Sequence, residues 1–90
     1  MARQHEKLSI YFAAILALLE DVLTPAEQWQ FQISIDAGEH RTTFRALCSN
    51  LREKGGVIPT EAAQLLVELG KRLRVDESVW GHFKMTARDP

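Results

Sequence analysis

LSIYFAAILALLEDVL, residues 8 to 23, is the most apolar run in the chain, and we expect the other elements to fold against it. Its large apolar side chains recur at steps of three and four, which is the spacing of one continuous helix face. These positions are Leu8, Tyr11, Phe12, Ile15, Leu18, Leu19 and Val22. Burial of each large side chain contributes roughly 1.5–3 kcal/mol, so this face should supply much of the folding free energy.

The opposite side of this predicted helix carries small residues. Ser9, Ala13 and Ala17 are four positions apart and Leu16 lies beside them, whereas an exposed helix face normally carries charge. Small side chains at this spacing allow a second helix to approach closely. The first expectation is that another helix of the same chain covers this ridge, and the alternative is a second copy or a different protein. The binding interpretation depends on Ala13 and Ala17 being covered in the folded protein.

Length and composition predict one ordinary globular domain. The 90 residues leave room for a single core, and the fractions of 46% hydrophobic and 26% charged residues are typical of folded domains. We expect residues 1–90 to form one helical domain, with residues 1–6 and 85–90 loose. The net charge of −1 argues against a general nucleic-acid binder. The apolar run is shorter than the about 20 residues that a membrane span needs, so no membrane contact is expected.

The cysteine content and the N-terminal sequence favour a cytoplasmic protein. Cys48 is the only cysteine, which excludes an internal disulfide and a disulfide-stapled secreted scaffold. The polar start MARQHEK before an apolar run resembles a signal peptide, but no cleavage site of small residues follows. The chain continues instead with Glu20 and Asp21.

A second helix is predicted to begin almost where the first one ends, at about Leu23. Thr24 can cap it, Pro25 suits the first helical position, and Glu27 stands three residues after Thr24, as a capping box requires. So short a join implies that the two helices are antiparallel or crossed neighbours.

Residues 29–36 are ambiguous between helix and strand. Large apolar side chains occupy every second position, which is a strand pattern. They are Trp29, Phe31, Ile33 and Ile35. In a helix, one face would instead hold Ala26, Trp29, Ile33 and Ala37. The helix is favoured because its start signal is strong and no second strand is available to pair with a lone one. The alternative is an α+β fold with a short strand or hairpin at about 29–44.

Three more helices are predicted downstream. The first is capped by Thr42 or Thr43 and carries an amphipathic stripe of Phe44, Leu47, Cys48 and Leu51. The next is capped by Thr60 and carries Ala62, Leu65, Leu66, Leu69 and Leu73. A short last helix starts at Asp76 or Ser78 and presents Val79, Trp80 and Phe83. The predicted fold is therefore all-α, a compact bundle of four helices plus a short C-terminal fifth.

The sequence carries no pattern that predicts catalysis, a cofactor or a metal site. Cys48 lies on an apolar helix face and is expected to behave as a small buried hydrophobe. His5, His40 and His82 are far apart and share no metal-ligand spacing with Cys48 or the carboxylates. We therefore expect a protein that is not an enzyme.

The function favoured by the sequence is a non-enzymatic protein–protein interaction module, a small adaptor or regulator. Its partner would be another protein or a second copy of itself, and a homodimer is the simplest version. The terminal aromatic residues form a second candidate anchor besides the small-residue ridge. The predicted partner-binding residues are Ser9, Ala13, Leu16, Ala17, Trp80 and Phe83.

The alternative function is a small DNA-binding regulator that uses the basic residues of the third and fourth predicted helices. These residues could contact phosphates, although a solvated helix face with cations near a helix C-terminus explains them as well. They are Arg41, Arg45, Arg52, Lys71, Arg72 and Arg74. Nucleic acid is the less favoured partner.

Overall fold

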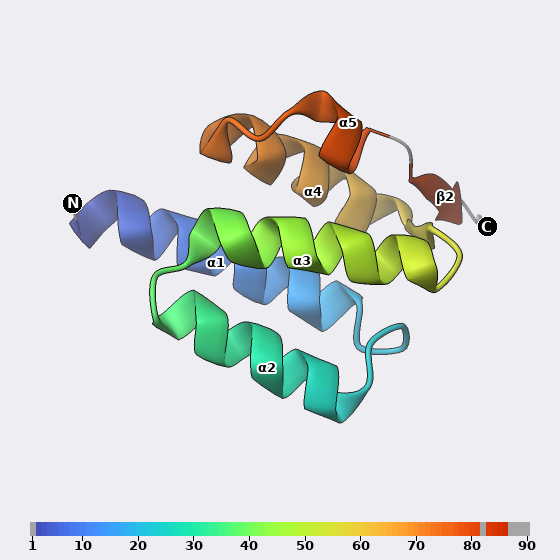
Figure 1. The fold of residues 1–90 in the computed structure, drawn as a ribbon, viewed down its shortest axis with the longest axis horizontal. Coiled ribbons are helices and arrows are strands. Elements are labelled where there is room, and N and C mark those ends of the chain that lie inside the picture. Colours follow the sequence, from blue (N-terminus) through green and yellow to red (C-terminus); the bar gives the residue numbers. More distant parts are fainter. Residues whose placement is uncertain (1, 82, 87–90) are drawn as a thin grey trace.

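A computed structural model describes residues 2–81 and 83–86, and the fold is a compact all-α bundle (Figure 1). The described helices are α1 (Ala2–Leu18), α2 (Pro25–Asp36), α3 (His40–Glu53), α4 (Thr60–Leu73) and α5 (Glu77–Trp80). The short strands are β1 (Val57–Pro59) and β2 (Lys84–Thr86). The predicted four helices plus a short fifth are confirmed, and the alternative with a strand or hairpin at 29–44 is wrong.

The apolar stripe of α1 supplies one wall of the core. Phe12, Ile15 and Leu19 are fully buried, while Tyr11, Leu18 and Val22 pack against the core from its edge. Helix α1 lies against α2 on one side and α4 on the other. The predicted stripe is therefore confirmed as the buried face.

The bounds of α1 differ from the prediction at both ends. The helix begins at Ala2, so residues 2–6 are not the loose segment that we expected, and Met1 lies outside the described residues. It ends at Leu18, and a hydrogen-bonded turn follows, in which Leu23 N donates to Leu19 O at 2.9 Å. Residues 19–23 therefore form the connection to Thr24, the N-cap of α2.

Residues 25–36 are a helix because the capping box forms. Glu27 N donates to Thr24 Oγ1 at 3.1 Å, and Thr24 N donates to Glu27 Oε1 at 2.9 Å. These two bonds satisfy donors that a helix start leaves open, and Pro25 occupies a position that needs no N–H donor. The local start signal therefore prevails over the alternating apolar pattern.

Helices α3 and α4 are amphipathic, and their apolar stripes close the core. The buried residues of α3 include the predicted Phe44, Leu47, Cys48 and Leu51. The buried residues of α4 are Ala62, Ala63, Leu66, Leu69, Gly70 and Leu73. The predicted caps are wrong: α3 begins at His40, before Thr42 and Thr43, and α4 begins at Thr60 itself, because Glu39 and Pro59 occupy the N-cap positions.

A small parallel sheet joins two segments that are far apart in the chain. Val57 pairs with Lys84, Ile58 with Met85 and Pro59 with Thr86. We expected residues 85–90 to be loose, but Met85 and Thr86 belong to β2, and residues 87–90 lie outside the described part. Runs of three residues carry no strand signal of their own, so the return of the chain after α4 and α5 creates this pairing.

Candidate interaction surface

The small-residue ridge of α1 is not covered in the single chain. Ala13 and Ala17 are exposed, Ser9 is half-buried, and Leu16 is buried in the core. The expectation that another helix of the same chain covers this ridge is therefore wrong, and Leu16 cannot contact a partner without unfolding. The sequence-based argument for a binding role required these two alanines to be covered, so that argument fails, and exposed alanines alone do not indicate a binding site.

A large apolar side chain, which sequence reasoning did not assign to any surface, accompanies the ridge. Ile10 is 68% exposed, and it precedes Ala13 and Ala17 by three and seven positions, so the three residues share one helix face. Lys7 lies exposed at one end of this face, and Glu20 is exposed just after the other end. The outer face of α1 is thus apolar in the middle and oppositely charged at its ends.

Helix α2 also exposes a large apolar face. Trp29 is 68% exposed and Ile33 is 51% exposed, whereas Ile35 is buried. Ala26 and Ala37 are exposed on the same side, which is the helical face identified from the sequence. The sequence pattern contained this face, but nothing in it indicated that the face points toward solvent.

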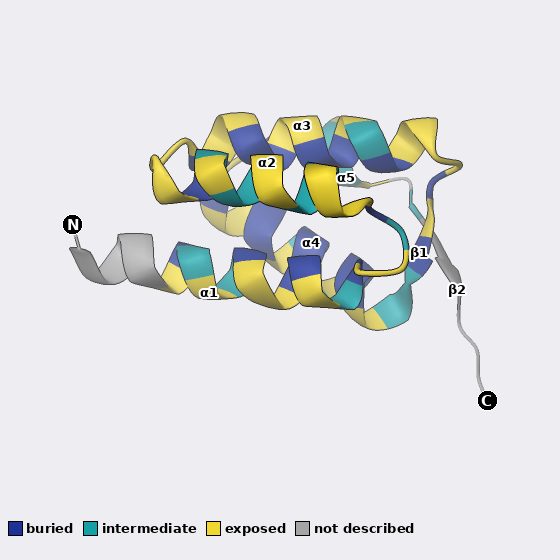
Figure 2. Ribbon diagram, turned by 90° about the horizontal axis from the view of Figure 1, so that it is seen from below, coloured by how far each residue is buried: buried dark blue, intermediate teal, exposed yellow. Residues whose placement is uncertain are grey.

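Helices α1 and α2 are neighbours, and each has an exposed face; on the other flank of α1, Ala17 lines an open groove with Leu65 of α4. Helices α1 and α2 run in opposite directions along the bundle (Figure 1), and Gln28 Nε2 donates to Leu16 O at 2.9 Å. Figure 2 shows exposed segments on both helices on the side of the molecule that faces the viewer. We call the combined face the outer α1/α2 surface and define it by Ile10, Ala13, Ala17, Trp29 and Ile33.

The C-terminal aromatic residues pack against the end of the bundle. Trp80 Nε1 donates to Val75 O at 2.9 Å, and its ring lies on Gly70, where an added Cβ would be only 2.5 Å from the ring. The ring of Phe83 lies under the Arg52 guanidinium, 5.6 Å from its centroid. Trp80 and Phe83 are therefore half-buried residues that close the core, which is the structural role that such terminal aromatics usually have.

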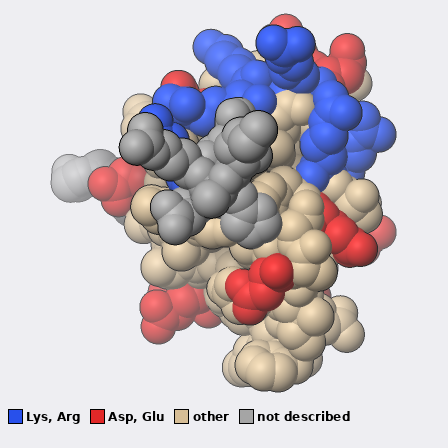
Figure 3. Space-filling view, turned by 90° about the vertical axis from the view of Figure 1, so that its left-hand side faces the viewer, with Lys and Arg blue, Asp and Glu red and all other residues tan. Residues whose placement is uncertain are grey.

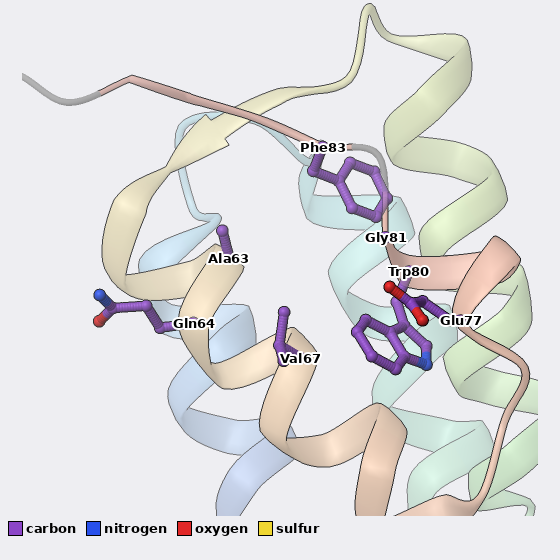
Figure 4. A pocket seen from close by; sticks show the side chains of 7 residues that line it. All are labelled: Ala63, Gln64, Val67, Glu77, Trp80, Gly81 and Phe83. Atoms are coloured by element: carbon purple, nitrogen blue, oxygen red, sulfur yellow. The ribbon is translucent and has the colours of Figure 1, made fainter.

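A small pocket lies between α4, α5 and Phe83 (Figure 4). Its volume is about 290 Å³, enough for one large apolar side chain. The lining residues are Ala63, Gln64, Val67, Glu77, Trp80, Gly81 and Phe83. Among the described residues of this lining, Glu77 is the one with a carboxylate, and Gln64 contributes an amide.

Several basic residues of the predicted set lie at the end of the bundle where α3 begins and α4 ends. Figure 3 shows Lys and Arg side chains clustered on one part of that end. Arg41 ties the two helices together, because its Nε donates to Leu73 O at 2.9 Å. Arg45, Lys71 and Arg74 are exposed. The structure therefore brings together part of the predicted basic set.

Two other basic residues are engaged in contacts within the chain. Arg52 lies away from this cluster and donates to the carbonyl oxygens of Ser78 and Val79. Arg72 lies over the ring of Tyr11, 4.9 Å from its centroid, and reaches a Glu68 carboxylate oxygen at 3.7 Å. These guanidinium groups stabilise the fold, which leaves fewer cations for an outside partner.

The interior thiol and imidazole are packed rather than arranged for chemistry. Cys48 is fully buried, as predicted, and this burial raises the pKa of its thiol to about 12. A protonated thiol is a poor nucleophile. His40 is also buried, with its ring 5.7 Å from the ring of Phe12. Within the described residues, no three His, Cys, Asp or Glu side chains lie together as metal ligands.

No helix in the described part of the chain is long and apolar enough to cross a membrane. No protein-family model, curated protein or solved structure matches this chain.

Proposed function

We propose that this protein is a non-enzymatic protein–protein interaction module, a small cytoplasmic adaptor or regulator that binds through the outer α1/α2 surface. One observation carries the proposal. Of the four large hydrophobic residues that are most exposed among the described residues, Ile10, Trp29 and Ile33 lie on this surface. Single exposed apolar residues are ordinary, whereas several large ones on two neighbouring helices favour an interaction site.

The chemistry of the side chains supports a binding role. Tryptophan is the residue type that most often dominates binding energy, because a rigid indole removes a large area from water at small entropic cost. Trp29 projects from a regular helix rather than from a loop, so its position is set before a partner arrives. A preorganised anchor of this kind lowers the entropic cost of binding.

The distribution of charge gives a second line of support. No Lys, Arg, Asp or Glu occurs in residues 8–19 or in residues 28–35, which include the whole outer α1/α2 surface. The buried centre of protein interfaces is depleted of charge in the same way, while charges occupy the rim. Lys7 and Glu20 directly flank the first of these two segments, and Glu61 and Glu68 of α4 lie across the groove that Ala17 lines.

The test compares the wild-type protein with the double variant Trp29→Ala/Ile33→Ala. Both side chains are largely exposed, so the variant should keep the helical content and nearly the stability of the wild type. Crosslinking in intact cells, followed by mass measurement, should give a larger species for the wild type and the single-chain mass for the variant. Val57→Ala is the matched control, because Val57 is 47% exposed but lies on β1. A wild-type protein that yields only the single-chain mass would contradict the proposal.

Binding of nucleic acid through the basic end is the second candidate function. It is supported by the exposed Arg45, Lys71 and Arg74 near the junction of α3 and α4. Fluorescence anisotropy with generic duplex DNA at low and moderate salt tests it, because phosphate contacts produce an affinity that falls steeply with salt. Absence of binding at low salt would remove this candidate.

A further inference from the structure

We infer that the open groove between α1 and α4 is a docking site for a basic amphipathic helix of a partner protein. The groove lies on the flank of α1 that faces away from α2, so it is separate from Trp29 and Ile33. Its volume is about 680 Å³, against about 290 Å³ for the pocket beside Trp80. The inference therefore concerns a second surface and does not depend on the proposed function of the first.

The floor of the groove is apolar. Tyr11, Leu18 and Leu65 pack against the core from its edge and keep part of their side chains exposed. Tyr11 and Leu18 are seven positions apart, so they mark two turns of one face of α1, about 10 Å at 1.5 Å per residue. Ala14 lies between them and is small and exposed, which leaves room for another helix. Two turns suit a bound helix, whose apolar anchors recur at the same spacing.

The α4 side of the groove carries a polar row. Glu61, Gln64 and Glu68 are exposed and follow one another at steps of three and four along one helix face. Among the described residues that line the groove, none is a lysine or an arginine, so the lining is negatively charged. A helix on the apolar floor has its flanking side chains beside this row. Two basic residues seven positions apart match the separation of Glu61 and Glu68, and such complementarity selects a basic partner over an acidic one.

Arg72 marks one end of the groove and leaves Glu68 accessible. Helices α1 and α4 run in opposite directions (Figure 1), so Tyr11 lies beside the C-terminal half of α4. The Arg72 guanidinium is 4.9 Å from the ring centroid of Tyr11 and 3.7 Å from a Glu68 carboxylate oxygen. The two charged side chains are 44% and 52% exposed, and an ion pair in water is weak. A basic side chain of a partner can therefore reach Glu68 without breaking a buried contact.

Two synthetic helical peptides of about 18 residues test the chemistry of the partner. Both carry leucines at positions i, i+3 and i+7, and they differ only in the flanking side chains, which are lysines in one peptide and glutamates in the other. Fluorescence anisotropy of the labelled peptides gives the dissociation constants. The acidic peptide should bind at least about tenfold more weakly than the basic one at low salt. Equal affinities, or no binding of the basic peptide at about 500 µM protein, would overturn the inference.

A charge reversal tests whether the two glutamates select the peptide. Glu61→Lys/Glu68→Lys should reverse the preference, so that the acidic peptide binds more tightly than the basic one. Asp36→Lys/Glu53→Lys is the matched control, because it changes the net charge equally at exposed positions outside the groove. This control should keep the wild-type preference. Circular dichroism checks that each variant is folded, and a preference that Glu61→Lys/Glu68→Lys leaves unchanged would overturn the inference.

A neutral substitution tests the position of the peptide. Ala14→Gln places a longer side chain on the floor of the groove and should weaken binding of the basic peptide about tenfold. Ala46→Gln makes the same change at an exposed alanine of α3 and should have no effect. Binding that Ala14→Gln leaves unchanged would contradict the assignment of the groove.

Failure of this inference is distinguishable from failure of the proposed function. The double variant Trp29→Ala/Ile33→Ala should bind the basic peptide as the wild type does, because both residues lie outside the groove. If this variant loses the peptide, the peptide binds the outer α1/α2 surface, which overturns the groove as the site and supports the proposed function. Conversely, peptide binding that meets these tests supports the groove even where crosslinking in cells gives only the single-chain mass.

Discussion

Helices α2 and α3 are neighbours of similar length, but they are attached to the bundle in different ways. The large apolar residues of α3 all point inward, and Phe44, Leu47 and Cys48 are completely buried. Those of α2 are divided, because Ile35 is buried while Trp29 and Ile33 face solvent. Helix α3 therefore turns its large apolar side chains into the core, whereas α2 leaves two of its large apolar side chains exposed to solvent.

Polar contacts replace apolar burial in holding α2. Gln28 reaches a backbone oxygen of α1, and the Ser34 and Thr43 hydroxyls are 2.5 Å apart between α2 and α3. Glu27 accepts from Asn50 Nδ2 at 3.0 Å and pairs with Lys54 Nζ at 3.0 Å. A helix anchored by its polar side chains can keep apolar ones for its outer face. Burial of a few apolar residues is therefore enough to hold α2 in the bundle when polar side chains fix its orientation.

The largest expected difference is between core and surface aromatic residues. Phe44→Ala should lower the free energy of unfolding by about 3–5 kcal/mol, because it leaves a cavity in the core. Trp29→Ala should lower it by less than about 1 kcal/mol, because the indole is already solvated in the single chain. Denaturant unfolding at low micromolar protein measures both. Similar losses for the two variants would contradict the division between α2 and α3.

The contact between Gly70 and Trp80 tests whether the packing of α4 is as tight as that of α3. Gly70→Ala should destabilise the protein by about 1–2 kcal/mol, because the clash with the indole outweighs the better helix propensity of alanine. Trp80 fluorescence and denaturant unfolding measure the effect.

The Trp80→Ala background provides the control for this substitution. With the ring removed, Gly70→Ala should be neutral or stabilising, since only the helix propensity remains. An equal loss in both backgrounds would show that the ring is not the cause.

The polar attachment of α2 should depend on pH. Hydrogen bonds from Asn50, the Thr24 backbone N–H and Lys54 lower the pKa of Glu27 from 4.5 to about 2. The ionised carboxylate therefore contributes stability above about pH 4.5, and this contribution is lost as the pH falls toward 2. Glu27→Gln should be less stable than the wild type at neutral pH, and the difference should shrink on acidification.

Urea unfolding between about pH 2 and pH 7 measures this difference, since linkage relates its slope to proton uptake. Glu53→Gln controls for the loss of one negative charge, because Glu53 is exposed at the end of α3. A pH-independent difference between Glu27→Gln and the wild type would contradict the assigned role of the ionised carboxylate.

The smallest expected effect is at the end of α4. Arg74 adopts a left-handed conformation with φ 57°, which is unfavourable for a residue with a Cβ. Arg74→Gly should stabilise the protein by about 0.5 kcal/mol, since relief of the strain exceeds the entropy that glycine adds to the unfolded chain. The Arg41 bond to the Arg74 carbonyl uses backbone and is retained. A lower thermal midpoint would count against this.

Local signals in the chain were enough to predict most of the helices. The capping box at Thr24 and Glu27 and the spacing of Phe44, Leu47 and Leu51 act within a few residues, so no distant contact is needed to recognise them. The buried stripe of α1 was predicted for the same reason. The bounds were less accurate, because the residue that caps a helix depends on how the preceding turn is folded.

The candidate site was only partly predictable. The helical face that contains Trp29 and Ile33 could be described from the sequence, and so could the small residues of α1. Ile10 was missed because an apolar residue within an apolar run gives no sign of its exposure. Trp80 and Phe83 were proposed as partner contacts, yet both are packed against the bundle.

What the amino-acid order determined about this protein is the identity and direction of its main helices, because periodicity and capping are properties of neighbouring residues. Tertiary structure alone decided which side of α2 faces solvent, since Ile35 and Ile33 are equally apolar and only the positions of α1 and α3 distinguish them. It also decided that Gly70 receives the ring of Trp80 and that β1 pairs with β2. These outcomes depend on distant segments meeting, and no local pattern carries that information.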